Sequence, residues 1–332
     1  MNRIINNADF VVEDMLRGIL KAESGTVAAT ENPRVIKYVK APVPGKVGLV
    51  TGGGSGHEPT FLGYVGENLC DAAAVGEVFS SPSPVHFYEA IKAADGGRGV
   101  VCLYGNYAGD NMNVHMAIRK AQKDGITVKT VVASDDAASA PEAEKDKRRG
   151  GASLVFLWKI AGTKAALGAD IDEVVAVGEK VIQNARAVSI GTRPCTIPAV
   201  GHPNFTIEDG TVEIGVGIHG EAGARIEPLK SANDTADQAL QILLDDLDIG
   251  QNDEAAVLVS GLGATPLMEQ YIFYDRVEEI LCGRGISVYK AYVGNYVTSL
   301  EMMGITMSVL KLDGELKALL DMPARSMGFR QP

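Results

Sequence analysis

Apolar residues recur at two different spacings in the first half of the chain, and each spacing predicts its own kind of element. Residues 11–20 place apolar side chains at helical spacing and predict an amphipathic helix. Short apolar runs predict strands within 46–59, 71–79, 99–106 and 126–133, and helical stretches at 84–94 and 112–123 lie between them. Strands that alternate with helices are typical of a layered, mostly parallel sheet.

The pattern changes near residue 186. Prolines interrupt the stretch 192–205, and residues 205–219 then predict two strands around a Glu-Asp-Gly turn. Further along we expect helices at 235–247 and 266–282 and strands at 255–261, 286–293 and 305–312. The sequence therefore predicts an α/β protein of two domains. Residues 1–186 would form a layered, mostly parallel sheet with helices, and residues 187–332 a smaller α+β domain.

Composition and charge narrow the class of protein. The 332 residues are 46% hydrophobic and 22% charged, which is typical of a globular protein in water. A formal net charge of −11 would repel nucleic acid and anionic membranes, so we expect neither as a partner. The acidic amino-terminal stretch is no signal peptide, and no apolar run approaches the roughly 20 residues that span a bilayer. The four cysteines lie far apart, as expected of buried free thiols in a reducing compartment, and we predict a cytoplasmic protein.

The stretch "TGGGSGHEP", residues 51–59, is the strongest local signal for a site. We expect its three consecutive glycines to form a tight turn after a strand, where backbone N–H groups could approach a ligand. The stretch matches neither a Walker loop nor a GxGxxG loop. A structural turn alone would explain Gly52–Gly54. It would not explain why Ser55 and His57 stand at the same strand end.

Asp110, in "CLYGNYAGD", stands at the end of a second predicted strand. A single aspartate there is often a helix N-cap, and that alternative stays open. His57 and Asp110 would therefore be two polar residues at the ends of two strands of one sheet. A neutral imidazole and a carboxylate could together handle the proton of a substrate hydroxyl near pH 7.

His219, in "VEIGVGIHGEAG", stands between glycines at the end of an apolar run. It belongs either to a hairpin turn that carries a polar residue or to a site where a ligand must come close to the ring. His86, His115 and His202 are more typical of surface or structural positions. The polar stretch 134–151 predicts a solvated loop, with a lid or a partner contact as the alternative. Without a nucleotide loop or metal-ligand spacing, we expect any phosphoryl donor to be held elsewhere.

Five motifs in order resemble the dihydroxyacetone kinase substrate-binding subunit family, DhaK. They are "SGHEP", "GNYAGD", "RRGG", "EIGVGIHGE" and "GLGATPLMEQYI", and the resemblance covers essentially the whole chain. It implies a cytoplasmic homodimer of two α/β domains that binds dihydroxyacetone or a related short ketose in glycerol metabolism. It further implies a phosphotransferase whose nucleotide, ATP or ADP with Mg, is held by a separate L-subunit. A phosphotransferase-system M-subunit would be a possible further partner, and this chain itself would bind no cofactor or metal.

The same resemblance implies roles for individual residues. His219 would attack the ketone and hold the substrate as a covalent hemiaminal, with His57 and Asp110 as the acid–base pair. Backbone and side-chain groups of Gly54, Ser55 and Gly56 would cradle the triose. A neutral imidazole can add to a carbonyl and cannot add to an alcohol, so covalent capture would separate dihydroxyacetone from glycerol.

One position departs from the family pattern. Many members have a lysine just before the "NY" of "GNYAGD", where this chain has Gly105. The change removes a donor and would add room, so a four-carbon ketose such as erythrulose is an alternative substrate. A second alternative is a catalytically silent relative that binds dihydroxyacetone and acts as a transcriptional coactivator. Because both His57 and Asp110 are present, the enzyme is favoured over the coactivator.

Overall fold

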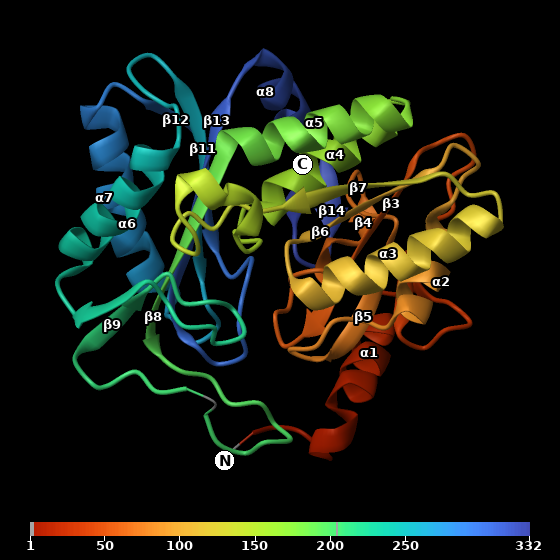
Figure 1. Ribbon diagram of the computed structural model, residues 1–332, viewed down its shortest axis with the longest axis horizontal. Helices are drawn as coiled ribbons and strands as arrows, with labels where there is room; N and C mark the ends of the chain where they lie inside the picture. Colours follow the sequence, from red (N-terminus) through yellow and green to blue (C-terminus); the bar gives the residue numbers. More distant parts are fainter. Residues whose placement is uncertain (1–2, 204) are drawn as a thin grey trace.

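Two six-stranded sheets organise the chain in the computed structural model, which describes residues 3–203 and 205–332 (Figure 1). The first sheet has the order β1-β2-β5-β3-β6-β7. Its strands are β1 (Val27–Ala29), β2 (Val35–Tyr38), β3 (Gly48–Ser55), β5 (Ala72–Val78), β6 (Val100–Gly105) and β7 (Val128–Ala133). The four strands from β5 to β7 are parallel, whereas β1 and β2 are antiparallel. The prediction of a mostly parallel amino-terminal sheet is confirmed.

Helices cover both faces of this sheet because successive strand residues point to opposite sides. Val100, Cys102 and Tyr104 of β6 pack with α2 (Pro84–Ala94) and α3 (Ala108–Lys123). Val101 and Leu103 pack on the other side with α4 (Leu154–Ala166) and α5 (Ile171–Asn184). The predicted amphipathic helix is α1 (Val11–Ala22), and α2 has the predicted bounds 84–94.

The second sheet has the order β10-β9-β8-β13-β11-β12 and is antiparallel except for its last pair. Its strands are β8 (Ala185–Arg193), β9 (Thr211–Ile214), β10 (Arg225–Pro228), β11 (Glu254–Gly261), β12 (Ser287–Gly294) and β13 (Met303–Leu312). Helices α6 (Ala232–Asp246) and α7 (Leu267–Gly283) cover its outer face, as Figure 1 shows. The predicted helices and strands after residue 230 are thus confirmed within a few residues.

Helices α4 and α5 pack between the two sheets, so one hydrophobic cluster takes residues from both. Helix α8 (Gly314–Asp321) packs on α4, and the last residues form a small sheet of β4 (Gly66–Glu67), β14 (Ala324–Ser326) and β15 (Arg330–Gln331). The second sheet begins at Ala185, next to the predicted boundary. The division into domains 1–186 and 187–332 stays a prediction.

The strand predicted at 205–207, before the Glu-Asp-Gly turn, does not form, whereas the turn itself does. Residues 208–211 close a turn through a hydrogen bond from Thr211 N–H to the Glu208 carbonyl, and Gly210 adopts φ +78°. Strand β9 pairs instead with β10, with Ile214 opposite Arg225. The hairpin therefore encloses residues 215–224, which include His219. Asn204, in the predicted proline-rich connection, lies outside the described residues.

The three consecutive glycines, Gly52–Gly54, are part of β3, so the turn predicted there is wrong. They are glycines because neighbours come too close for a side chain. A Cβ on Gly52 would lie 2.6 Å from the Phe87 ring, and one on Gly53 would overlap the Phe61 ring. In this stretch only Gly56, at φ +95°, uses the conformational freedom that a turn needs.

The stretch 134–151 is a solvated loop only in its middle. Residues 141–147 are exposed or nearly so and include the short helix η3 (Glu142–Lys147). The two ends are buried, with Asp135, Asp136 and Arg148 at most 6% exposed. Sequence reasoning missed these ends because Arg148 pairs with Asp246, far along the chain, and Asp136 pairs with Arg149 at the other end of the stretch.

Two further predictions, on the cysteines and on membrane-spanning helices, can be compared with the structure. Cys70, Cys102 and Cys195 are buried free thiols as predicted, whereas Cys282 is exposed. In the part of the chain that the structure describes, the helices are too short or too polar to cross a membrane.

Candidate active site

The carboxyl ends of three neighbouring parallel strands bring the predicted site together. His57 follows β3, Phe79 follows β5 and Tyr107 follows β6, and the loop 215–224 of the second sheet meets them. The ring centroid of His219 lies 4.8 Å from His57, 5.5 Å from Phe79 and 5.0 Å from Tyr107. The two predicted histidines are thus neighbours, although they come from different sheets.

His57 is fully buried and held in one tautomer. Its Nδ1 lies 2.8 Å from the Thr298 carbonyl oxygen, which can only accept, so Nδ1 carries the proton. Nε2 then carries the lone pair, and it has no hydrogen-bond partner among the described residues. Burial, helped by the charge of His219, lowers the pKa of His57 to about 3. His57 is therefore a neutral hydrogen-bond acceptor at physiological pH.

Asp110 is the third residue of α3, and the N-cap of that helix is Tyr107. The capping explanation for Asp110 is therefore wrong. Its carboxylate accepts a hydrogen bond from Ser81 Oγ at 2.6 Å and is 8% exposed. Burial raises the pKa of Asp110 to about 6, although the Ser81 bond and the charge of His219 oppose the shift. A carboxyl with this pKa can accept a proton near neutral pH.

Glu221 orients His219 and is a site residue that sequence reasoning missed. Its Oε1 lies 2.8 Å from His219 Nδ1, and its Oε2 accepts the His219 backbone N–H at 3.0 Å. Burial alone would raise the pKa of Glu221, but the hydrogen bonds and charge of His219 bring it down to about 2. The carboxylate keeps the proton on Nδ1, so the His219 lone pair is on Nε2. The signal in the sequence was the His-Gly-Glu spacing.

The glycines around His219 serve the loop itself. A side chain on Gly217 would overlap the Glu221 carboxylate, and Gly220 adopts φ +83° in the turn that follows His219. The missing side chain at Gly217 therefore makes room for Glu221 and not for a ligand.

Two of the three predicted cradle residues already have internal partners. Ser55 Oγ donates to the Gly76 carbonyl at 2.8 Å, and the Gly56 N–H donates to the Glu58 carboxylate at 3.0 Å. Gly54 is pressed against Ser80, whose backbone nitrogen would lie 2.7 Å from a Cβ there. The role of these residues in holding a substrate stays a prediction.

Backbone strain gathers around His57. Phe61, Phe79 and Leu300 have φ of 63°, 59° and 51°, a region that bulky residues rarely adopt. The Phe79 ring stacks on His57 at 4.8 Å, and the Leu300 N–H donates to the Gly56 carbonyl at 2.6 Å. Such strain persists where surrounding contacts impose it and is concentrated at functional sites.

The other polar clusters do not join this site. His86 is bonded to Asn32, and His202 and His115 are exposed. Across residues 3–203 and 205–332, no three His, Cys, Asp or Glu side chains are placed to hold a metal ion.

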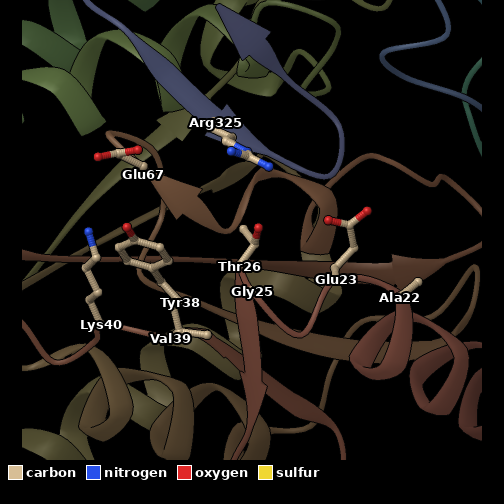
Figure 2. A pocket seen from close by; sticks show the side chains of 9 residues that line it. All are labelled: Ala22, Glu23, Gly25, Thr26, Tyr38, Val39, Lys40, Glu67 and Arg325. Atoms are coloured by element: carbon tan, nitrogen blue, oxygen red, sulfur yellow. The ribbon is translucent and has the colours of Figure 1, made fainter.

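A separate surface hollow of about 290 Å³ lies at the other end of the first sheet (Figure 2). Its lining includes Tyr38, Glu67 and Arg325. Tyr38 ends β2 beside the amino end of β5, whereas Phe79 follows the carboxyl end of β5. None of the predicted site residues lines this hollow, so we place the site at His57, Asp110 and His219.

Comparisons with known proteins identify the family of the chain. The Dak1 domain model matches residues 17–328. The dihydroxyacetone-binding subunit DhaK of PTS-dependent dihydroxyacetone kinase 1 from Listeria innocua is 45% identical over 315 residues, which cover 95% of each chain. L-erythrulose 1-kinase from Mycolicibacterium smegmatis is 35% identical over 344 residues, which span 100% of this chain and 58% of the kinase. The solved structure of the dihydroxyacetone kinase operon co-activator DhaQ matches with a TM-score of 0.89 at 30% identity, covering 96% of this chain and 98% of that one.

The chain therefore belongs to the Dak1 family, which includes the DhaK subunits of dihydroxyacetone kinases. The resemblance drawn from the five motifs is confirmed over nearly the whole chain.

Proposed function

We propose that this chain is the substrate-binding subunit of a dihydroxyacetone kinase and that His219 captures dihydroxyacetone as a hemiaminal. The observation that carries the proposal is the pairing of His219 with Glu221, with the His219 ring in edge-to-face contact with the buried acceptor His57. The 45% identity to a dihydroxyacetone-binding subunit supports it.

In the proposed capture step the nucleophile is Nε2 of His219, because the proton of the ring is on Nδ1. The Nε2 lone pair adds to the ketone carbon while the C=O π bond opens. The oxygen takes a proton from water to become a hydroxyl, which leaves a hydroxide ion to the bulk solvent. The imidazole ring thereby gains a positive charge, which the Glu221 carboxylate at 2.8 Å balances. His57 Nε2, buried and with its lone pair available, accepts a hydrogen bond from a hydroxyl of the adduct. Glycerol has no carbonyl and cannot be captured in this way.

Phosphoryl transfer then needs a base and a donor. Asp110, with its pKa near 6, takes the proton of the terminal hydroxyl as that oxygen attacks phosphorus. Fixing the triose on His219 supplies orientation, on which phosphoryl transfer largely depends. The donor is a nucleotide, ATP or ADP with Mg, on a separate L-subunit, with an M-subunit of the phosphotransferase system as a further partner. We expect the chain to act as a homodimer.

A four-carbon ketose is a second candidate substrate, favoured by Gly105 and by the 35% identity to an erythrulose kinase. The room expected at Gly105 is partly filled by Tyr107, because a Cβ on Gly105 would lie 3.1 Å from that ring. Tyr107 is fixed there by a bond from its hydroxyl to the Gly150 carbonyl at 3.0 Å. This packing supports the triose as the substrate.

Dihydroxyacetone labelled with ¹³C at its ketone carbon tests capture in solution. Binding to the wild-type chain should move the NMR signal of that carbon from the ketone to the hemiaminal region, and His219→Ala should abolish the shift. The His219→Ala chain should also lose its preference for dihydroxyacetone over glycerol. A ketone signal that persists in the wild-type complex would contradict covalent capture.

A further inference from the structure

The loop that carries His219, residues 215–224, is fixed from outside its own hairpin. Gly215, its first residue, adopts φ +80° and is pressed against the segment 136–139, since a Cβ there would lie 2.7 Å from the Ala138 Cβ. A small cavity of about 10 Å³, room for roughly one water molecule, is lined by Asp136 of this segment and by residues 216–218 of the loop. The position of His219 therefore depends on residues of the stretch 134–151.

Arg149 makes the polar contacts across this junction. Its Nη2 donates to the Gly215 carbonyl at 2.5 Å, and its Nε donates to Asp136 Oδ2 at 3.0 Å. The two side chains are only 15% and 8% exposed. A charge-assisted pair in this setting is stronger and better ordered than one on the surface.

The same guanidinium lies beside the group that orients His219. A Cβ placed on Gly217 would be 2.7 Å from Arg149 Nη1 and would also overlap the Glu221 carboxylate. The guanidinium and the Glu221 carboxylate therefore both lie close to the backbone of Gly217. Arg149 thus bonds the loop at its start, Gly215, and lies beside the Gly217 backbone, where the Glu221 carboxylate also lies.

Hydrogen bonds hold the backbone at Arg149 in place. Its N–H donates to Ser139 Oγ at 3.0 Å, and its carbonyl accepts the Asp136 N–H at 3.1 Å. Just beyond it, the buried Asp135 carboxylate accepts N–H bonds from Gly151 and Ser153 at 2.7 and 3.0 Å. A guanidinium on such a base can hold the loop in one place, because its planar fork fixes two partners at once.

We propose that Arg149 is a positioning residue for covalent capture, which keeps Glu221 on Nδ1 of His219 and so presents Nε2 to the ketone. The inference rests on the proposed function. A purely structural ion pair would stabilise the fold without affecting the tautomer of His219.

Arg148 provides the matched control. It is also a buried arginine, 2% exposed, and it donates to both oxygens of Asp246 at 2.6 and 2.7 Å. Its side-chain partners, Asp246 and the Ala140 carbonyl, lie outside the His219 loop. Arg148→Met should lower the free energy of unfolding and leave capture unchanged.

The experiment compares Arg149→Met, Arg149→Lys and Arg148→Met in the full chain. Affinity for ¹³C-labelled dihydroxyacetone, ¹⁵N shifts of the His219 ring and urea unfolding are measured for each. Arg149→Met should weaken capture by roughly 10²-fold, the order expected when a reacting group is misplaced, with a mixture of His219 tautomers. Arg149→Lys, which keeps the charge but can hold only one partner well, should lie between this variant and the wild type.

Two results would overturn the inference. One is wild-type capture and an unchanged Nδ1–H tautomer in a folded Arg149→Met chain. The other, if that variant does not fold, is wild-type capture by Arg149→Lys. In either case the proposed function would still stand if His219→Ala abolished the hemiaminal signal. If the wild-type chain shows no such signal, the proposed function fails first.

Discussion

Burial gives the two predicted acid–base residues different roles. It lowers the pKa of His57 to about 3 and raises that of Asp110 to about 6, because in each case it disfavours the charged form. His57 therefore stays neutral and accepts hydrogen bonds, and in the proposed mechanism the proton of the substrate hydroxyl would pass to Asp110. These roles are narrower than the shared acid–base work that the motifs imply.

Asp110→Asn tests this assignment. The amide keeps the shape of the side chain but cannot accept a proton, so turnover with an L-subunit should fall by roughly 10²-fold or more. Capture on His219 should persist, because Asp110 is not needed for attack on the ketone. Turnover is measured with a saturating L-subunit, and near wild-type turnover would remove Asp110 from the mechanism.

The same residue sets the pH dependence of turnover. Asp110 is active as a carboxylate, so the rate should rise with pH through about 6 and be lost as the pH falls below it. Ser81→Ala removes the hydrogen bond that lowers the pKa of Asp110, so the midpoint should move to higher pH. A midpoint that Ser81→Ala does not move would exclude Asp110 as the titrating group.

At the scale of elements, close packing at the end of β3 determines where His57 lies. Gly53→Ala should push the Phe61 ring, which lies edge-on to His57 with the centroids 6.2 Å apart. We expect a loss of about 1–3 kcal/mol in the free energy of unfolding, the usual cost of overpacking, together with weaker capture. Urea unfolding and the ¹³C assay measure the two effects.

Gly18→Ala in α1 is the control for that substitution. No atom lies within 4 Å of a Cβ at Gly18, so alanine there should stabilise the helix by up to about 1 kcal/mol and leave capture unchanged. A Gly53→Ala chain as stable as the wild type would contradict the packing argument.

Whether an element could be predicted from the sequence depends on what surrounds it in the fold. Helix α1 has one buried face, and its periodicity is visible in the sequence. Helix α4 lies between two sheets and is buried on nearly all sides, so it has no polar face to mark it. In the site, His57, Asp110 and His219 stand out locally, whereas Arg149 acts through residues distant in sequence. Its pairing with Gly215 becomes visible only when the two sheets are brought together.

At the scale of the whole molecule, we expect the proposed chemistry to need a second protein. Phosphoryl transfer depends on cations that clamp the phosphates, and a chain of net charge −11 does not attract a nucleotide polyphosphate. The exposed middle of 134–151 is a candidate contact for the partner. It belongs to the same stretch as Arg149, so a partner that docks there would lie near the support of the His219 loop.

The purified chain should therefore bind short ketoses and phosphorylate none of them with ATP alone. Adding an L-subunit should give dihydroxyacetone phosphate, and the contact should be transient because the site must reopen for substrate exchange. A coactivator, by contrast, should bind a DNA-binding regulator and stay inactive with every L-subunit tried. The two roles are separated by assaying dihydroxyacetone and erythrulose with several L-subunits, beside a binding assay with such a regulator. Robust phosphorylation by the chain and ATP without any partner would show that the chain has a nucleotide site of its own.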